Sequence, residues 1–236
     1  MNDFQSGKIK KALTFSYDDA VTQDIQMIEL MNKYGIKGTF NLNSELLGSS
    51  SILNGGSFRV CHYKLSPQDV PYVYEGHEVA VHTLTHINLT TVPDEEVIRQ
   101  VEQDRLNLSG IAGYEVVGMA YPCGGVNNDD RVAEIIKNHT GVRYSRTTTT
   151  NNSFDLQDNL YRFNPTSYHH DFDSMMALGE KFLAMDPDKP QIFYIWGHSY
   201  EQDLRSDYWV KLEEFFKLMA GHDDVFYGTN AQVLLK

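Results

Sequence analysis

The chain has 236 residues, enough to bury a full hydrophobic core, and it carries 32 acidic against 20 basic residues, a formal net charge of −12. This excess of negative charge argues against nucleic acid or an anionic membrane as the main partner. The apolar runs are strand-sized and fall short of the ~20 residues that a membrane-spanning helix needs.

Compartment and domain number follow from equally simple features. The first residues lack the basic and apolar stretches of a secretory signal, and two cysteines, Cys61 and Cys123, do not make a disulfide framework. We therefore expect a cytoplasmic protein. Because no linker rich in proline, glycine or serine divides the chain, residues 1–236 are expected to form one domain.

Strand-like and helix-like segments alternate along the chain. Strands are predicted at residues 12–17, 38–43, 78–81, 117–121, 142–147, 160–163, 192–196 and 225–228. Helices are predicted at residues 22–34, 93–109, 130–138, 172–185 and 207–219. This alternation is typical of α/β proteins with a parallel sheet, and about eight such units close a barrel. Residues 44–77 are less regular and are interpreted as an extended insertion between a strand and the next helix.

Residues that can do chemistry fall at the ends of the predicted strands. They are Asp18 and Asp19 after the first strand, His82 after the third, Tyr121-Pro122 after the fourth, Arg146 after the fifth and His198 after the seventh. In an α/β barrel the carboxyl ends of all strands meet at one rim, where the active site lies. The sequence therefore predicts an active site at the C-terminal rim.

Two histidines four residues apart stand out in the stretch HTLTH at residues 82–86. If a helical turn starts there, both imidazoles lie on one face and can bind one divalent metal. A carboxylate from the first strand would complete a three-ligand site with an open position for water, the arrangement of a catalytic metal. Thr83 stands where the metalloprotease motif has its glutamate, so a different metal-assisted hydrolysis is indicated.

Four stretches in order carry a resemblance to the first, second, third and fifth of the five motifs of a known family: TFSYDDA at 14–20, HTLTH at 82–86, AYPCG at 120–124 and IWGH at 195–198. With them the chain resembles the polysaccharide deacetylase family, the NodB-homology group of carbohydrate esterases. The resemblance implies a distorted (β/α) barrel of seven to eight strands. It also implies a metal-dependent hydrolase that removes an N-acetyl group from an amino sugar or glycan.

The resemblance also assigns roles to the motif residues. It makes Asp19, His82 and His86 the metal ligands, Asp18 the general base and His198 the acid that protonates the departing amine. Mixed nitrogen and oxygen ligands favour zinc, with cobalt, nickel and manganese as alternatives. Residues expected at the substrate or oxyanion position are Tyr121, Pro122, Cys123 through its backbone N–H, His169 and His170.

The chain departs from the family pattern at the first, third and fourth motifs. The first contains an insert-like Ser16-Tyr17 and ends in Ala20 instead of glycine. Ala120 stands where the family has an arginine that pairs with the catalytic aspartate, and Arg143 or Arg146 can replace it; we favour Arg146. The fourth motif, which contributes a helper aspartate, has no clear match, and the candidates are Asp155, His169, His170 and Asp171. His62 lies in the insertion and is assigned no role.

Two other functions stay open at this level. A hydrolase with the same barrel can act on a non-sugar linear amide or another C–N bond by the same activation of water. A catalytically lapsed carbohydrate-binding domain is the third hypothesis, and the retention of Asp18, Asp19, His82 and His86 argues against it.

Overall fold

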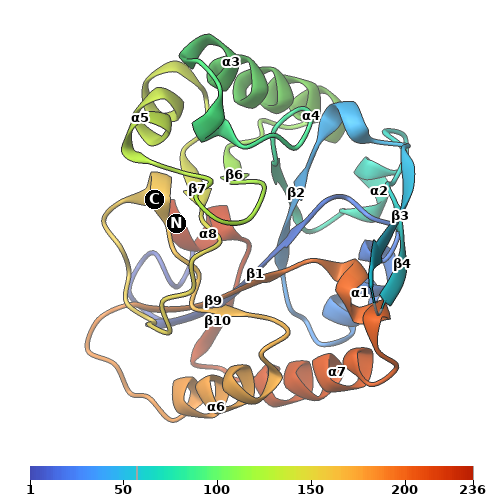
Figure 1. Cartoon of the computed structure of the whole chain (residues 1–236). Helices are drawn as coiled ribbons and strands as arrows, with labels where there is room; N and C mark the ends of the chain where they lie inside the picture. The colour runs from blue at the N-terminus through green and yellow to red at the C-terminus, as the bar shows by residue number, and fades with distance from the viewer. Residues whose placement is uncertain (57, 236) are drawn as a thin grey trace.

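A curled β-sheet forms the centre of the molecule in the computed structural model, which describes residues 1–56 and 58–235 (Figure 1). The sheet has eight strands, and the pairings between them in the described part of the chain are parallel. In spatial order they are β7 (Tyr144–Arg146), β6 (Gly118–Ala120), β5 (Glu78–Val81), β2 (Gly38–Leu42), β1 (Lys11–Asp18), β9 (Gln191–Gly197) and β8 (Ser167–Tyr168), while β10 (Val225–Tyr227) pairs with the start of β1.

The segment 163–168 joins the two edges of this sheet. Phe163 N donates a hydrogen bond to Ser145 O of β7 at 3.0 Å, and Thr166 N donates to Tyr194 O of β9 at 2.7 Å. The sheet therefore curls into a distorted barrel, as the sequence predicted.

One predicted strand, at residues 160–163, is wrong. The backbone from Leu160 to Arg162 forms a 3₁₀ turn instead. The Asn159 side chain accepts a hydrogen bond from Tyr161 N at 3.1 Å, and such a local bond competes with extended backbone. Only Phe163 keeps the parallel bridge, to Arg146 of β7.

Helices cover the outside of the sheet, with α3, α4 and α5 on one side and α6 and α7 on the opposite side (Figure 1). The α-helices are α1 (Asp24–Lys33), α2 (Val70–Val73), α3 (Asp94–Ile98), α4 (Asp104–Ala112), α5 (Asp130–His139), α6 (Phe172–Leu183), α7 (Tyr208–Met219) and α8 (Asn230–Leu234). The 3₁₀ segments are η1 (Ser44–Leu46), η2 (Leu89–Thr91), η4 (Leu160–Arg162) and η5 (Ser199–Leu204). None of the helices in residues 1–56 and 58–235 has the length and apolar character to cross a membrane.

The sequence determines where these helices begin and end. In α5 the Asp129 carboxylate accepts a hydrogen bond from Val132 N at 2.8 Å and caps the first turn. Val132, Ile135 and Ile136 then fall on the buried face at helical spacing. Gly35, with φ of +67°, follows the end of α1, where a residue with a side chain would be strained.

The predicted helix at 93–109 is a continuous helix with an irregular middle. Its centre, η3 (Arg99–Gln103), is a π-helical turn between α3 and α4. The helix ends at Ala112, later than predicted. The residue with the positive φ that ends it is Gly113, at +78°, and not Gly110. A π-turn leaves no signature in the hydrophobic pattern, so the sequence did not reveal it.

The insertion at 44–77 contains an antiparallel hairpin, β3 (Ser50–Gly55) and β4 (Phe58–Tyr63), followed by α2. Its second strand lies against the chain that leaves β1: Thr22 N donates to Tyr63 O and Leu65 N donates to Ala20 O, both at 2.8 Å. The hairpin therefore stands beside the end of β1, which carries Asp18 and Asp19.

Candidate metal centre and active site

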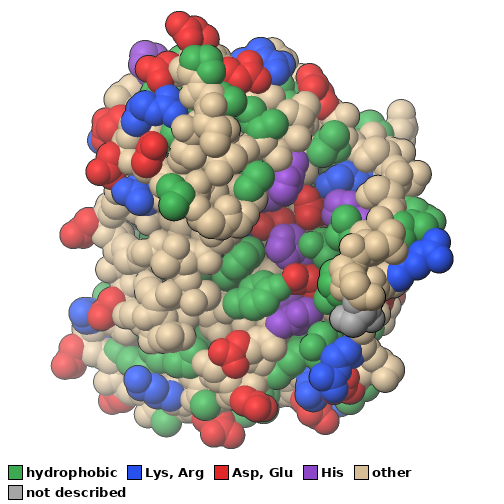
Figure 2. Space-filling model, in the orientation of Figure 1, with side chains coloured by type: hydrophobic (Ala, Val, Ile, Leu, Met, Phe, Trp, Pro, Cys, Tyr) green, Lys and Arg blue, Asp and Glu red, His purple; other side chains and the backbone are tan. Residues whose placement is uncertain are grey.

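The predicted rim residues except Pro122 and Arg146 line one cavity of about 450 Å³. Figure 2 shows the corresponding hollow, where histidine and acidic side chains gather at the surface. Among the residues that line it are Asp18, Asp19, His82, His86, Tyr121, Cys123, Thr148, Trp196, His198 and Tyr200. They come from the carboxyl ends of β1, β5, β6, β7 and β9, so parallel strand ends meet here as expected of this fold.

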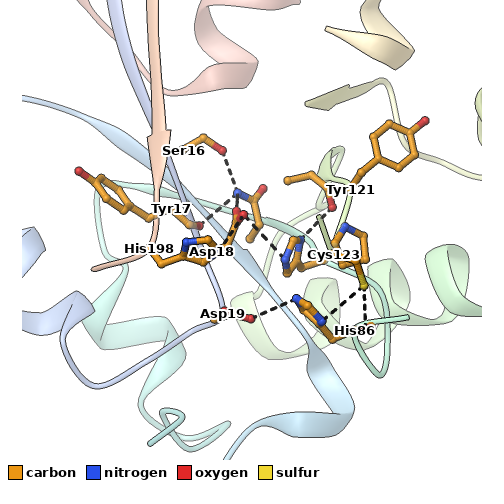
Figure 3. A network of polar contacts seen from close by, with 12 residues as sticks. Ser16, Tyr17, Asp18, Asp19, His86, Tyr121, Cys123 and His198 are labelled. Carbon is orange, nitrogen blue, oxygen red and sulfur yellow. Dashed lines mark hydrogen bonds and ion pairs between the residues drawn. The ribbon is translucent and has the colours of Figure 1, made fainter. Parts of the chain in front are cut away.

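Asp19, His82 and His86 come together, with their candidate ligand atoms within 4.8 Å of one another. Figure 3 shows the side chains of Asp19 and His86 pointing toward each other. His86 Nε2 lies 3.7 Å from Asp19 Oδ1. The two histidines are not on a helix, contrary to the expectation from their spacing. They converge because Thr83 and His86 adopt positive φ, +66° and +58°, and turn the loop back on itself.

The residues present fit a divalent metal. His82 Nδ1 lies 2.9 Å from the carbonyl oxygen of Ala120, so Nδ1 carries the proton and Nε2 keeps its lone pair for a ligand. Burial lowers the pKa of His82 to about 4, although the neighbouring Asp18 charge opposes this, and the imidazole is therefore neutral near pH 7. Two imidazole nitrogens and one carboxylate are a donor set that zinc accepts.

Asp18 is held by Arg146, the residue favoured from the sequence. Arg146 Nη2 lies 2.7 and 2.6 Å from the two Asp18 oxygens, and both side chains are buried. Asn41 Nδ2 donates a further bond to Asp18 Oδ1 at 2.8 Å. The Trp196 ring covers the guanidinium, which lies 4.6 Å from its centroid.

The charge state of Asp18 follows from these contacts. Burial raises the pKa of Asp18, but Arg146, His82 and His198 lower it by more, and the net pKa lies below the ordinary value. Asp18 is thus a carboxylate at neutral pH. Its Oδ2 atom lies 3.8 Å from His82 Nε2 and 3.9 Å from His198 Nε2, between a candidate metal ligand and the candidate acid.

His198 is paired with Glu201, three residues later. His198 Nδ1 lies 3.1 Å from Glu201 Oε2, an ion pair whose atoms are off the straight line of a hydrogen bond. Burial lowers the pKa of His198, but Glu201, Asp18 and Asp19 outweigh it and raise the pKa to about 9. His198 therefore carries a proton at neutral pH.

Glu201 also binds one of the two histidines that were expected near the substrate, and the second histidine stacks on the first. His169 is fully buried, and its Nε2 donates to Glu201 Oε2 at 2.8 Å because Gln202 Nε2 donates to its Nδ1 at 3.0 Å. His170 stacks on His169 with ring centroids 4.3 Å apart. Neither ring lines the cavity, and both lie behind Glu201. Asp155 and Asp171, the other fourth-motif candidates, bond to Gln191 and cap α6 respectively.

The third motif places Tyr121 and Cys123 at the cavity and buries Pro122 between them. Tyr121 OH donates to Tyr161 O at 2.9 Å, so its hydroxyl is engaged away from the rim. Cys123 has φ of +70°, and its backbone N–H has no acceptor among the described residues. Burial and the Asp19 charge raise the pKa of the Cys123 thiol, which argues against a thiolate nucleophile.

Two residues in or next to the hairpin, His62 and Lys64, reach the site, although the sequence analysis did not assign them to it. His62 Nε2 lies 3.3 Å from Asp19 Oδ2, and Lys64 Nζ lies 3.2 Å from Asp19 Oδ1. Lys64 Nζ also donates to Asp19 O at 2.6 Å and to Asn43 Oδ1 at 3.3 Å. These contacts overturn the reading of His62 as ordinary insertion sequence. No local pattern marks them, because their role depends on the docking of the hairpin.

Comparison with known proteins gives one match of sequence and several of structure. Residues 5–145 match the model of the polysaccharide deacetylase family. No protein of curated function matches the sequence at a significant level.

Solved structures with low sequence identity share the fold. A family 4 carbohydrate esterase from Streptomyces lividans, in complex with acetate, is 12% identical with a TM-score of 0.56, over 93% of each chain. The chitin deacetylase of the fungal pathogen Colletotrichum lindemuthianum is 18% identical with a TM-score of 0.61, over 97% of this chain and 88% of that one. Puue allantoinase is 11% identical with a TM-score of 0.70, over 99% of this chain and 92% of that one.

Proposed function

Because the chain belongs to the polysaccharide deacetylase family, we propose that it is a metal-dependent hydrolase that removes the N-acetyl group from an amino sugar or glycan. One observation carries the proposal: Asp18 Oδ2 lies between the metal-ligand candidate His82, at 3.8 Å, and the protonated His198, at 3.9 Å. A base, an acid and a three-ligand site therefore face the same cavity, as hydrolysis of an amide requires.

Asp19, His82 and His86 would hold the metal. When bound, a divalent ion there would act as a Lewis acid on the acyl oxygen and the attacking water. The proposed metal is zinc, and cobalt, nickel or manganese can use the same ligands.

The side chains of this chain would divide the proton transfers between them. Asp18 accepts a proton from water as the water oxygen bonds to the acyl carbon, and Arg146 keeps this carboxylate in place. The Cys123 N–H donates to the developing oxyanion. His198 gives its proton to the amine nitrogen as the C–N bond breaks, which releases acetate and the free amine. Glu201 holds the His198 ring and takes the role of the unmatched fourth motif.

A second candidate function is hydrolysis of a non-sugar amide. It is favoured by the extent of overlap with Puue allantoinase, at 99% of this chain, and the same base and acid would serve it. Retention of the base and all three ligand candidates argues against the lapsed binding domain.

A single screen tests these functions. Purified protein with one equivalent of zinc is assayed for acetate release from N-acetylated sugars and for hydrolysis of allantoin. We expect acetate from the sugars. Hydrolysis of allantoin alone would overturn sugar deacetylation and support the second candidate function. Inactivity toward both substrates would overturn both functions.

A further inference from the structure

The loop that carries His82 and His86 has a strained backbone. Thr83 and His86 adopt positive φ, +66° and +58°, a conformation that costs free energy in residues other than glycine. Such a conformation persists only where surrounding groups hold it in place. Leu84 and Thr85 lie between these two residues, so the bonds of their backbone N–H groups decide whether the loop keeps its shape.

Both of these N–H groups bond to one residue, Gln100. The carbonyl oxygen Gln100 O accepts a hydrogen bond from Leu84 N at 3.0 Å, and the side-chain oxygen Gln100 Oε1 accepts one from Thr85 N at 3.2 Å. Gln100 is buried, so water is a poor substitute for either bond. One residue thus holds the backbone midway between the two candidate metal ligands.

The π-turn makes the main-chain bond available. Gln100 lies in η3, where the helix runs from α3 into α4. In a regular α-helix Gln100 O accepts a hydrogen bond from Asp104 N, four residues later. Here Asp104 N donates to Val101 O instead, and Gln100 O accepts from Leu84 N. Such π-turns are rare and occur frequently at functional sites, which agrees with a role at the metal centre.

The side-chain amide of Gln100 has one favourable orientation. Glu96 Oε1 lies 3.0 Å from Gln100 Nε2, and a carboxylate only accepts hydrogen bonds. Thr85 N only donates. The amide NH₂ group therefore faces Glu96, and the amide oxygen faces Thr85 N. Thr85 Oγ1, 3.0 Å from Gln100 Nε2, is a third partner of the amide.

Other groups hold the first part of the same loop. Asn43 Nδ2 donates to Thr83 O at 2.9 Å and also to His82 O. Asp104 Oδ2 accepts from His82 N at 3.2 Å. These bonds fix residues 82 and 83, which directly follow β5. The turn back toward His86 depends on Gln100.

We propose that Gln100 is a positioning residue for His82 and His86. It holds the backbone between them, so that both imidazoles face the same point before a metal ion arrives. Gln100 does not line the cavity, and its effect passes through the loop. This inference rests on the proposed metal site, and it makes metal affinity depend on a residue outside the cavity.

Zinc affinity, measured by competition with a chelator in the absence of substrate, tests this role. Gln100→Met preserves volume and the main-chain bond to Leu84 N, but it removes the side-chain bonds. We expect ~10-fold weaker zinc binding, at the lower end of the effect of groups that orient metal ligands, because one of the two bonds to the loop remains. The visible absorption spectrum of bound Co²⁺, which reports the ligand geometry, should change as well.

Two control variants separate positioning from general stability. Gln103→Met, on the exposed face of the same π-turn, should match wild type in zinc affinity. Leu212→Ala removes buried apolar volume from α7, on the opposite side of the sheet (Figure 1). It should lower the melting temperature while zinc affinity and the Co²⁺ spectrum stay at wild-type values.

Where Gln100→Met does not fold, the milder Glu96→Ala carries the test. It leaves Gln100 in place but removes the acceptor that orients its amide, and we expect ~3-fold weaker zinc binding. Arg99→Ala is its control, because Arg99 pairs with the same carboxylate, at 2.7 Å, on the exposed surface. Equal zinc affinities of these two variants would then overturn the role of Gln100.

Each other outcome has a defined meaning. If Gln100→Met lowers the melting temperature and keeps wild-type zinc affinity, Gln100 is only structural and the inference fails. If Gln103→Met or Leu212→Ala weakens zinc binding as much as Gln100→Met, the effect is not specific and the inference fails too. If wild type binds no zinc, the proposed metal site itself is wrong.

Discussion

The ends of strands β1, β5 and β9 and the hairpin β3–β4 face each other across the same cleft, but they hold their side chains in different ways. At the rim, Asp18 and His82 are almost fully buried, and each is fixed by bonds to two or more groups from other strands. In the hairpin most residues are exposed, and Val60 is the buried one among the strand residues described.

From this contrast we expect the rim residues to carry out catalysis and the hairpin residues to contribute to substrate recognition. Buried polar groups at the rim lose much free energy when a partner is removed, because the remaining group has no water to replace it. Exposed groups of the hairpin regain water when a bond is lost. We therefore expect rim substitutions to remove activity and hairpin substitutions to adjust substrate preference.

The largest effect is expected from the rim substitution His82→Ala. It removes one of three ligand candidates, and we expect metal affinity to fall by more than ~100-fold and activity with it. Elemental analysis of protein purified without chelator gives the metal content. His139→Ala, at the exposed end of α5, is the control. A His82→Ala protein with wild-type metal content would refute the ligand assignment.

Asp18→Asn should affect turnover while the metal stays bound. The amide keeps the shape of the side chain but is no base, and general base catalysis contributes ~10²–10⁴-fold. Steady-state kcat and metal content are measured together. Asp19→Asn is the matched variant, and it should lose metal as well. Exchanged phenotypes of the two variants would reverse their roles.

Arg146→Gln tests how much the buried ion pair between Arg146 and Asp18 contributes to stability. It leaves the Asp18 carboxylate buried without its charged partner, and breaking such a pair costs ~3–5 kcal/mol of unfolding free energy. Urea denaturation is the measurement. Arg143→Gln, at the exposed arginine that was the alternative from the sequence, should change stability by less than ~0.5 kcal/mol. Equal losses would show that Arg146 is not the buried partner.

The difference between rim and hairpin also explains which parts of the fold and of the site could be predicted from the sequence. Strand–helix alternation predicted the barrel, and strand ends predicted that Asp18, His82, Arg146 and His198 share one rim. These depend on the period of the apolar pattern, which is local. Cytoplasmic location and a single domain stay predictions.

The residues that the sequence missed depend on tertiary docking. His62 and Lys64 reach Asp19 because β4 pairs with the chain after β1, from 43 to 45 residues away in sequence. Glu201 follows His198 by three residues, but its bond to His169, which holds that histidine behind the site, is a tertiary contact. The π-turn and the bonds of Gln100 to the loop at residues 82–86 occur together, and no local pattern encodes either.

A smaller effect than these substitutions is expected from pH. The pKa of His198 is raised to about 9, since Glu201, Asp18 and Asp19 outweigh burial. As the proposed acid, His198 must be protonated, so kcat should fall as pH rises through about 9. Its contribution to stability is complete below ~6.5 and is lost as pH rises through about 9. Glu201→Gln should move the fall in kcat to lower pH, whereas an unmoved profile would assign it to another group.

The smallest effect is expected from Gln23→Ala, which loosens the hairpin and leaves the rim intact. Gln23 Nε2 donates to Cys61 O of β4 at 3.0 Å and to Asp203 Oδ2 at 2.8 Å, and both bonds are exposed. Loss of such bonds costs ~1 kcal/mol or less, because water replaces them. We expect KM for a glycan to rise by less than ~3-fold while kcat and metal content stay at wild-type values. Gln26→Ala, exposed on α1 nearby, is the control. A loss of metal or of kcat in Gln23→Ala, absent from Gln26→Ala, would mean that the docked hairpin fixes Asp19 as firmly as the barrel does.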